Sequence, residues 1–355
     1  MATDVPPRVV VADDSGLMRR VIVRALRDAG LDVVGEARDG DEALAQCRSL
    51  RPDAMTLDLA MPGLDGIGVL RRLRSAGVRL DVPVVVVSAF SPAHGARAVD
   101  ALAEGAFDLV AKPAAGTGLQ PFAAELAAKV RAAASSSRRA TTPSRPATAG
   151  PRSSRPTART AQPADSARSR RLVVIASSTG GPRALASLVP RLPERLGIGT
   201  LLVQHMPAGF TGSLASRLDQ ASRLRVVEAG DGDAPAPDTA LLAPGGRHLR
   251  LAGPHAVELS DDDAIGGLRP RADLTIADAA RHFGRRLLLV VLTGMGDDGL
   301  AGAYAVRREG GRILAECEAS CTIYGMPRQI VEAGLADEVL DLEDMPAAIA
   351  REAAA

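Results

Sequence analysis

Three apolar runs in the second half of the chain restrict what it can fold into. They span residues 172–176, 201–203 and 287–292. Short uninterrupted apolar runs are typical of strands buried on both faces, as in a parallel sheet covered by helices. Because parallel strands end at the same edge of a sheet, polar groups just beyond these runs meet in one crevice. The polar residues concerned are Ser178, His205 and Asp298. They are the set that acyl transfer by a serine hydrolase needs, so we expect a hydrolytic site there.

Composition sets outer limits. The chain has 355 residues and is 46% hydrophobic, enough for two domains or more with ordinary cores. Aromatic residues make up only 2%, so few rings are present on which bases could stack, and we expect no nucleic-acid partner. Cys47, Cys317 and Cys321 lack a CxxC spacing, which favours reduced thiols over a zinc site. With no leader-like start and no apolar run of about 18 residues, we expect no membrane insertion and a cytoplasmic protein.

A segment without hydrophobic periodicity divides the chain. Residues 131–171 consist mainly of Ser, Thr, Ala, Pro and Arg, with ten arginines and a single acid, Asp165. Such a segment cannot bury enough surface to offset the entropy lost on ordering. We therefore expect domains at residues 1–128 and 171–355, joined by a disordered linker over 129–170. Its positive charge is compatible with binding nucleic acid or anionic lipid, but solvated spacing is the commoner use.

The first domain alternates short apolar strands with helical stretches. We expect strands at residues 8–12, 54–57, 82–87 and 109–111, and a helix over 17–28. This alternation is typical of a doubly wound parallel sheet with helices on both faces. Polar residues follow these strands: Asp13 and Asp14 follow residues 8–12, Asp58 follows 54–57, Ser88 follows 82–87 and Lys112 follows 109–111.

The acidic pair alone has an ordinary explanation, since Asp14 or Ser15 can cap the helix that follows. Three carboxylates at one sheet edge are different, because they repel one another unless a cation lies among them. A hard divalent cation that prefers oxygen ligands, such as Mg²⁺, fits this requirement. The edge then suits phosphoryl transfer to a carboxylate.

Four segments of this domain resemble the motifs of two-component response-regulator receiver domains: VVVADDSGLMRR, TLDLAMPGLDG, VVVVSAF and LVAKPA. The resemblance covers the whole domain and implies a flavodoxin-like fold in which Asp58 accepts a phosphoryl group from a histidine kinase. The implied Mg²⁺ ligands are Asp13, Asp14, Asp58 and the carbonyl of Ala60. Ser88 then senses the phosphoryl group by hydrogen bonding, and Lys112 pairs with its charge. Leu109 occupies a place where many receivers have a switching aromatic residue.

The second domain begins with LVVIASSTGGPRALASLV, which predicts a strand, a tight turn and a helix, with Pro182 suited to the first helical turn. Ser178 lies in the turn. Taken alone it is as readily a helix cap as a nucleophile, and the glycine-flanked turn is also compatible with a phosphate loop. The turn lacks, however, the lysine of a Walker loop and the GxGxxG spacing.

His205 and Asp298 favour a nucleophile over the helix cap and the phosphate loop as the role of Ser178. His205 follows TLLVQ at a strand end, just before Pro207, where the chain must leave the sheet. Asp298 lies in TGMGDDG, where Asp297 competes with it for the role and GDDG is otherwise an ordinary turn. The remaining histidines, His94, His248, His255 and His282, are interpreted as surface or core residues, with His248 also a candidate for lining the site. The conjunction of three strand ends favours a Ser178–His205–Asp298 triad.

The chain order Ser, His, Asp differs from that of the α/β-hydrolases and of the trypsin and subtilisin families. Six motifs instead resemble the chemotaxis protein-glutamate methylesterase family, also called the glutaminase: IASSTGGP, QHMPAGFT, LLAPGGRH, LRPRAD, LTGMGDDG and EASCTIYGMP. The resemblance spans residue 171 to about residue 345, and a receiver in front is that family's architecture. It implies a Rossmann-like parallel-sheet domain with no cofactor at the hydrolase site.

The motifs also imply roles for single residues. Ser178 matches the nucleophile in STGG, His205 the base in QHMP and Asp298 the carboxylate in GMGxDG. The other matches are Thr179 as a supporting hydroxyl, the Met295 backbone amide as an oxyanion donor, and Arg269 as an arginine near the substrate. The chain departs from the pattern with Asp297 for Asn, Ala176-Ser177 for Gly-Ala, and Arg271 for a small Ser.

The resemblance implies a phosphorylation-activated hydrolase that removes methyl esters from glutamate side chains of chemoreceptors and releases methanol, with deamidation of receptor glutamines as a second activity. The implied partners are the chemoreceptor's cytoplasmic domain and a histidine kinase, and an unphosphorylated receiver is expected to cover the crevice. Three alternatives remain open: a receiver-controlled scaffold with an inert triad, a methylesterase for proteins outside chemotaxis, and a DNA-binding regulator. The last lacks any helix-turn-helix pattern.

Overall fold

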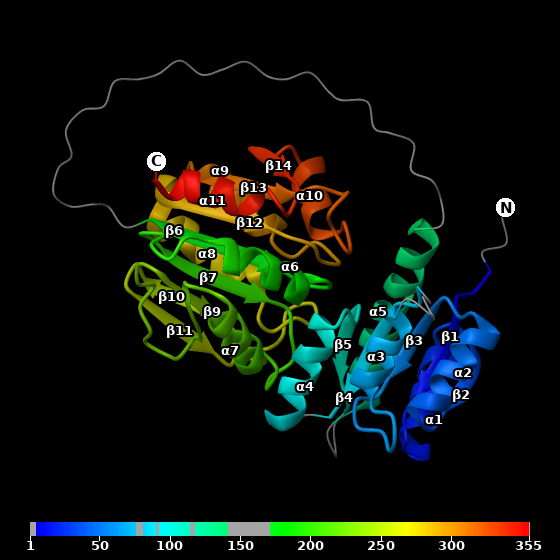
Figure 1. Ribbon diagram of the computed structural model, residues 1–355. Coiled ribbons are helices and arrows are strands. Elements are labelled where there is room, and N and C mark those ends of the chain that lie inside the picture. Colours follow the sequence, from blue (N-terminus) through cyan, green and yellow to red (C-terminus); the bar gives the residue numbers. More distant parts are fainter. Residues whose placement is uncertain (1–4, 76–80, 90–91, 114–117, 141–170, 355) are drawn as a thin grey trace, which may run out of the picture.

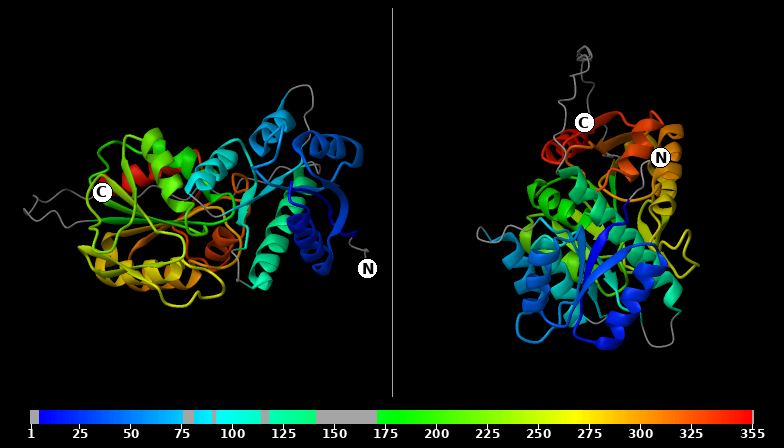
Figure 2. Two further views of the ribbon diagram at one scale, coloured as in Figure 1. Left: turned by 90° about the horizontal axis from the view of Figure 1, so that it is seen from below. Right: turned by 90° about the vertical axis from the view of Figure 1, so that its right-hand side faces the viewer.

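Two parallel α/β domains lie side by side in the computed structural model of the chain (Figures 1 and 2). It describes residues 5–75, 81–89, 92–113, 118–140 and 171–354, with residues 92–94 and 137–140 described by their backbone alone. The two-domain parallel-sheet fold predicted from the sequence is therefore confirmed. No helix in these ranges combines the length and the apolarity needed to cross a bilayer.

The first domain is a five-stranded parallel sheet in the order β2-β1-β3-β4-β5. The strands are β1 (Arg8–Ala12), β2 (Asp32–Ala37), β3 (Ala54–Leu57), β4 (Val84–Ser88) and β5 (Asp108–Ala111). The helices are α1 (Gly16–Asp28), α2 (Gly40–Leu50), α3 (Gly66–Arg74), α4 (Pro92–Ala103) and α5 (Leu119–Ala140). Helices α1 and α5 share one apolar cluster with one face of the sheet, and α2, α3 and α4 pack on the other. The strand order reverses between β1 and β3, where a doubly wound sheet places its site.

Local chemistry explains where these elements begin. Ser15 caps α1 by accepting the Met18 N–H at 3.3 Å, so the helix cap left open by the sequence is Ser15 and not Asp14. Strands β1 and β3 have the predicted bounds, whereas β4 begins at Val84 because Pro83 has no N–H for the ladder. One helix extends past residue 128, the expected end of the first domain. Helix α5 continues to Ala140, into the segment expected to be disordered, and residues 141–170 lie outside the described ranges.

The second domain is a seven-stranded parallel sheet in the order β14-β13-β12-β6-β7-β9-β8. Its strands are β6 (Leu172–Ser177), β7 (Gly199–Gln204), β8 (Arg225–Glu228), β9 (Thr239–Leu242), β12 (Leu287–Val291), β13 (Arg312–Glu316) and β14 (Glu338–Leu340). An antiparallel pair, β10 (His248–Gly253) and β11 (Ala256–Ser260), stands apart from the sheet. The order is Rossmann-like: the chain starts in the middle at β6, builds outward through β7, then crosses to β12 on the other side.

Helices cover both faces of this sheet as well. Helices α6 (Gly181–Leu188), α7 (Thr211–Ala221) and α11 (Met345–Ala354) pack on one face, and α8 (Ala272–Phe283), α9 (Leu300–Arg308) and α10 (Met326–Glu332) on the other. Two short 3-10 helices, η1 (Val189–Arg191) and η2 (Gly284–Arg286), complete the domain. The strand-to-helix turns that follow β6 and β12 thus flank the point where the sheet changes direction, and functional groups are expected there.

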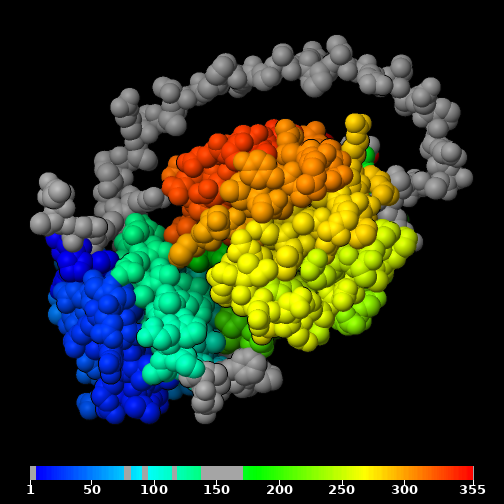
Figure 3. Space-filling view, turned by 180° about the vertical axis from the view of Figure 1, so that it is seen from behind, coloured from blue at the N-terminus to red at the C-terminus, as the bar shows by residue number. Residues whose placement is uncertain are grey.

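The domains meet through α4, which lies against α6 and α7 (Figure 1). One apolar cluster runs from the receiver-like domain into the second domain through Ala98, Val99, Ala101 and Leu102 of α4. From behind, the two domains form separate lobes that touch along a seam (Figure 3). Helix α4 therefore packs against both domains and is not a free surface.

Candidate functional site

Ser178, His205 and Asp298 lie at the carboxyl edge of the seven-stranded sheet, and among their side chains the described residues show one contact, between His205 and Asp298. His205 Nε2 lies 2.7 Å from Asp298 Oδ2. The loops that carry Ser178 and His205 are joined through Gln204, whose Nε2 donates to the carbonyls of both residues at 2.9 Å. The His205 N–H also donates to the Ser177 carbonyl at 3.0 Å. The nucleophile and base predicted from the sequence therefore lie on two neighbouring, mutually bonded strand ends.

The imidazole of His205 presents one nitrogen to the carboxylate and the other away from it. Because Asp298 accepts from Nε2, that nitrogen carries the hydrogen and Nδ1 carries the lone pair. Nδ1 is buried and meets no hydrogen-bond partner within the described ranges. It is the atom able to act as a base toward a neighbouring hydroxyl.

Asp298, and not Asp297, reaches His205. The Asp298 side chain is 1% exposed and also accepts the backbone N–H groups of Ala272 at 2.7 Å and Asp273 at 2.9 Å, whereas Asp297 is exposed. Burial opposes ionisation of Asp298. The hydrogen bond and charge of His205 and these two amides outweigh burial and lower the pKa of Asp298 to about 2. The carboxylate is therefore ionised at neutral pH and held in a fixed orientation.

The two adjacent serines have different surroundings. Ser177 is fully buried, and its hydroxyl donates to Gln204 Oε1 at 2.7 Å. Ser178 is half-buried, its N–H donates to the Thr293 carbonyl at 3.0 Å, and its hydroxyl makes no hydrogen bond within the described ranges. Ser178 is therefore the hydroxyl available for chemistry. The turn needs glycine after it, because a Cβ at Gly181 would lie 1.9 Å from Gln204 Oε1.

A second loop passes beside Ser178. A Cβ at Gly294 would lie 2.8 Å from the Ser178 Cβ, so only glycine allows the Thr293–Met295 backbone to approach so closely. Within the described ranges, the N–H groups of Thr179 and Met295 donate to no other group. Two unpaired backbone donors on either side of a serine can stabilise an oxyanion.

Arg269 is half-buried and lies farther along the same edge. Its Nη1 donates to the carbonyls of Asp261 at 3.1 Å and Asp262 at 3.0 Å. No ion pair or hydrogen bond joins its side chain to the three candidate catalytic residues within the described ranges. Arg269 lies just before α8, on the loop that leads to Ala272 and Asp273, whose N–H groups donate to Asp298.

The first domain gathers its predicted residues at the switch between β1 and β3. Carboxylate oxygens of Asp13, Asp14 and Asp58 lie within 4.8 Å of one another. Lys112 Nζ lies 2.8 Å from Asp13 Oδ2 and 2.8 Å from Asp58 Oδ2. Ser88 is buried, and its hydroxyl has no partner within the described ranges. This is a site with an unused hydroxyl and an excess of negative charge.

These residues fit a hard divalent cation. Burial raises the pKa of Asp13 in spite of its contact with Lys112. Burial also works against the charge of Lys112, but its hydrogen bonds to Asp13 and Asp58 prevail and raise its pKa. One ammonium group thus faces three carboxylates, and an all-oxygen set of this kind suits Mg²⁺. Ala60 lies beside it, with its N–H donating to Asp58 Oδ1 at 3.3 Å.

Known proteins match both halves of the chain. Residues 173–349 match the family model of the CheB methylesterase, and residues 9–121 match that of the response regulator receiver domain. The protein-glutamate methylesterase/protein-glutamine glutaminase of Symbiobacterium thermophilum is 42% identical over 353 residues, which cover 98% of this chain and 97% of that protein. The protein-glutamate methylesterase/protein-glutamine glutaminase 5 of Myxococcus xanthus is 44% identical over 352 residues, which cover 98% of this chain and 98% of that protein.

The chain belongs to the CheB methylesterase family. Its second domain is also similar to the crystal structure of the Thermotoga maritima CheB methylesterase catalytic domain, with 41% sequence identity and a TM-score of 0.50 over 52% of this chain and 98% of that one. The family resemblance given by the motifs is therefore confirmed.

Within this CheB family member, sequence reasoning missed that Arg271 and Asp273 support the site, and it named His248 only as a candidate for lining it. Arg271 Nε lies 3.2 Å from Asp298 Oδ1, and Arg271 Nη2 lies 2.8 Å from Asp273 Oδ2. His248 is fully buried, and its Nδ1 accepts the Arg271 N–H at 3.1 Å. The sequence marked Arg271 only as a departure from the family pattern, and nothing in it connected Asp273 with the triad.

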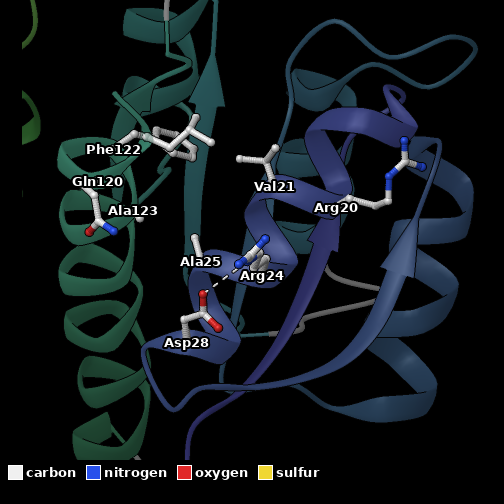
Figure 4. Close-up of a pocket in the computed structure, with 9 residues that line it drawn as sticks. Arg20, Val21, Arg24, Ala25, Asp28, Gln120, Phe122 and Ala123 are labelled. Atoms are coloured by element: carbon white, nitrogen blue, oxygen red, sulfur yellow. Dashed lines mark ion pairs between the residues drawn. The ribbon is translucent and has the colours of Figure 1, made fainter. Parts of the chain in front are cut away.

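A cavity of about 480 Å³ lies elsewhere, between α1 and α5 of the receiver domain (Figure 4). Arg20, Arg24, Leu119 and Phe122 are among the residues that line it, and Arg24 pairs with Asp28 at its rim. None of the candidate site residues of either domain lines it. The cavity is therefore separate from the phosphorylation and hydrolase sites.

Proposed function

We propose that this chain is a phosphorylation-activated protein-glutamate methylesterase with Ser178 as its nucleophile. One observation carries the proposal: His205 gives its Nε2 hydrogen to Asp298 while its Nδ1 stays buried and unpaired beside the Ser178 loop. A buried nitrogen without a partner is costly unless a function requires it. Accepting a proton from the Ser178 hydroxyl is such a function.

In the acylation step, Ser178 Oγ attacks the carbonyl carbon of a glutamate γ-methyl ester as His205 Nδ1 takes the hydroxyl proton. The bond from carbon to the methoxy oxygen then breaks, and methanol leaves with that proton. In the second step, His205 Nδ1 removes a proton from water as the water oxygen attacks the acyl carbon. The bond from that carbon to Ser178 Oγ then breaks, His205 returns the proton to Ser178, and the glutamate carboxylate leaves. Asp298, ionised and bound by two amides, holds the imidazole tautomer and stabilises the imidazolium.

The negative charge that develops on the carbonyl oxygen needs donors already in position. The Thr179 and Met295 N–H groups have no other partner within the described ranges, and the close passage of Gly294 brings the Met295 segment to the nucleophile. Removing one such donor typically costs about 100-fold or more in rate. We assign both amides to the oxyanion site, with the Thr179 hydroxyl and Arg269 in supporting and substrate-facing roles.

A glutamine side chain offers the same carbonyl with ammonia as the leaving group. The relatives named above carry both activities in their names, so we propose deamidation as the second activity of this chain. The substrate is the methylated cytoplasmic domain of a chemoreceptor, the phosphodonor is a histidine kinase, and the enzyme works in the cytoplasm.

Regulation follows from the position of α4. A Cβ at Gly95 would lie 2.6 Å from the Gly209 carbonyl oxygen, so α4 is pressed against the loop that leads from His205 into α7. Asp13, Asp14 and Asp58 would hold Mg²⁺, which would supply positive charge beside the phosphoryl group. Phosphorylation of Asp58 draws in the Ser88 hydroxyl at the end of β4. Since α4 follows β4, this movement displaces α4 from the catalytic domain and opens the site to a bulky receptor.

The test is methanol release from methylated receptor, measured for wild type, Ser178→Ala and Asp58→Asn with and without a small phosphodonor and Mg²⁺. We expect no activity above background for Ser178→Ala, and basal activity without activation for Asp58→Asn. Unchanged methanol release by Ser178→Ala would end the proposal that Ser178 is the nucleophile, and no methanol release by the wild type would favour the scaffold alternative. Activity on methylated proteins but not on receptor would favour the alternative with other substrates.

A further inference from the structure

Arg271 lies against the carboxylate of the proposed triad. Its Nε is 3.2 Å from Asp298 Oδ1, the oxygen that does not face His205 Nε2. The side chain is only 17% exposed and directs its Nη2 to Asp273 Oδ2 at 2.8 Å. The guanidinium is therefore committed to two carboxylates and has little surface left for a substrate.

Asp273 is itself anchored. Its other oxygen accepts the N–H groups of Gly299 at 2.9 Å and Gly302 at 2.8 Å, at the start of α9, and its own N–H donates to Asp298 Oδ1. Arg271 therefore closes a ring that joins the start of α8, the start of α9 and the triad carboxylate. A side chain in this ring can fix the orientation of the Asp298 carboxylate and can offset part of the negative charge that acts on His205.

The charged groups around Arg271 are mainly carboxylates. Asp273 and Asp298 touch it, and Asp297 acts on it through space. The other titratable group in contact is His248, which accepts the Arg271 N–H through Nδ1 and lies 3.2 Å from the Asp263 carbonyl through Nε2. That Nε2 must carry the hydrogen, so His248 is neutral and adds no charge. Arg271 is the cation that opposes these carboxylates within the described residues.

We infer that Arg271 is a positioning residue that holds Asp298 and offsets part of its negative charge, and so sets the pH range in which the triad works. The inference deepens the proposed function and rests on it. Asp298 stabilises the imidazolium that forms on His205 during each step. A guanidinium on the far oxygen weakens that stabilisation, because charges in a poorly solvated site interact strongly.

The direction of the effect follows. Without the guanidinium, the uncompensated carboxylates stabilise the imidazolium, and His205 then gives up its proton only at higher pH. The acidic limb of the kcat/KM profile should move upward by about 0.5–1 pH unit in Arg271→Ser, since one pH unit corresponds to about 1.4 kcal/mol. One unit below the wild-type limb, the variant should retain roughly a third to a tenth of the wild-type kcat/KM. Arg271→Lys keeps the positive charge and should hold the limb near its wild-type position.

The experiment uses the full chain with phosphodonor and methylated receptor, and determines kcat and KM across the pH range for Arg271→Ser, Arg271→Gln and Arg271→Lys. Arg281→Ser is the matched control, because it removes an exposed arginine from the last turn of the same helix, α8, with the same change in net charge. Arg271→Gln keeps much of the side-chain volume and serves if Arg271→Ser does not fold, as judged by circular dichroism.

The outcomes separate this inference from the proposed function. An upward shift of the limb in the two neutral variants, absent in Arg271→Lys and Arg281→Ser, supports it. A rise in KM with an unmoved limb overturns it and makes Arg271 a substrate contact. An equal shift in Arg281→Ser also overturns it, because the effect is then one of net charge. Ser178-independent methanol release instead defeats the proposed function itself.

Discussion

The guanidinium of Arg217 on α7 pairs with the carboxylate of Asp100 on α4, so an ion pair joins the catalytic domain to the receiver. Both side chains are about half exposed, at 42% and 50%, and exposed pairs contribute only about 0.2–1 kcal/mol. We expect Asp100→Ala and Arg217→Ala each to raise the basal activity of the unphosphorylated chain, by about 1.5- to 5-fold. The measurement is methanol release without phosphodonor.

The same pair offers its own control. The double variant Asp100→Ala/Arg217→Ala should be no more active than either single variant, because each substitution already removes the interaction. If the fold increases of the two single variants multiply in the double variant, the residues act separately, and their ion pair does not hold the domains together.

Gly95 provides a sharper test of the covered state. A methyl group there would lie 2.6 Å from the Gly209 carbonyl oxygen and 3.1 Å from Ser213 Oγ, both in the catalytic domain. Alanine favours a helix over glycine by roughly 1 kcal/mol, so Gly95→Ala should strengthen α4 while wedging the domains apart. We expect basal activity to approach the phosphorylated level, about 10-fold or more above wild type, if the contact costs about 1.4 kcal/mol. Gly118→Ala, whose added methyl group meets nothing within 4 Å, should leave activity unchanged.

The strand ends were predictable because strands buried on both faces are nearly pure apolar runs, which stop where Asp13, Asp58, Ser178 and His205 begin. The continuation of α5 was not. Its Ser- and Ala-rich end has the composition of a linker, yet Val130, Ala133 and Ala134 are fully buried in the receiver core. Small side chains carry a weak hydrophobic signal, and only tertiary packing shows which of them are covered.

The support of Asp298 was hidden for a different reason. Arg271 and Asp273 are more than twenty residues from Asp298 in the chain, and their pairing depends on α8 and α9 starting side by side. No spacing rule relates two helix starts on neighbouring connections of a sheet. The contact between the domains was likewise invisible, because it depends on small residues of α4 and on a glycine at position 95.

The depressed pKa of Asp298 predicts a dependence of stability on pH. Folding lowers this pKa from its ordinary value of 3.8 to about 2, so the unfolded chain binds the proton more readily. The ionised carboxylate therefore contributes stability that is fully present above about pH 5 and is lost as the pH falls toward 2. Its size is about 2 kcal/mol.

Asp298→Asn removes this contribution. The difference in free energy of unfolding between wild type and Asp298→Asn should be largest near neutral pH and shrink as the pH falls below about 4, measured by urea denaturation. Activity should fall by about 10⁴-fold, because the amide no longer enforces the productive tautomer. A stability difference that stays constant down to pH 2 would contradict the ionised, hydrogen-bonded carboxylate.

Ser177 and Ser178 form a matched pair for the final prediction, since the same substitution at adjacent positions should have opposite consequences. Ser178→Ala removes the proposed nucleophile and should lower kcat by about 10⁴-fold or more with little change in stability. Ser177→Ala removes the 2.7 Å hydrogen bond to Gln204, the residue that joins the Ser178 and His205 loops, and should cost about 1 kcal/mol of stability. Its kcat should fall by less than about 10-fold, because the nucleophile and base remain and only their alignment loosens. Thermal denaturation and methanol release on both variants check this, and a larger kcat loss in Ser177→Ala than in Ser178→Ala would exchange the roles of the two serines.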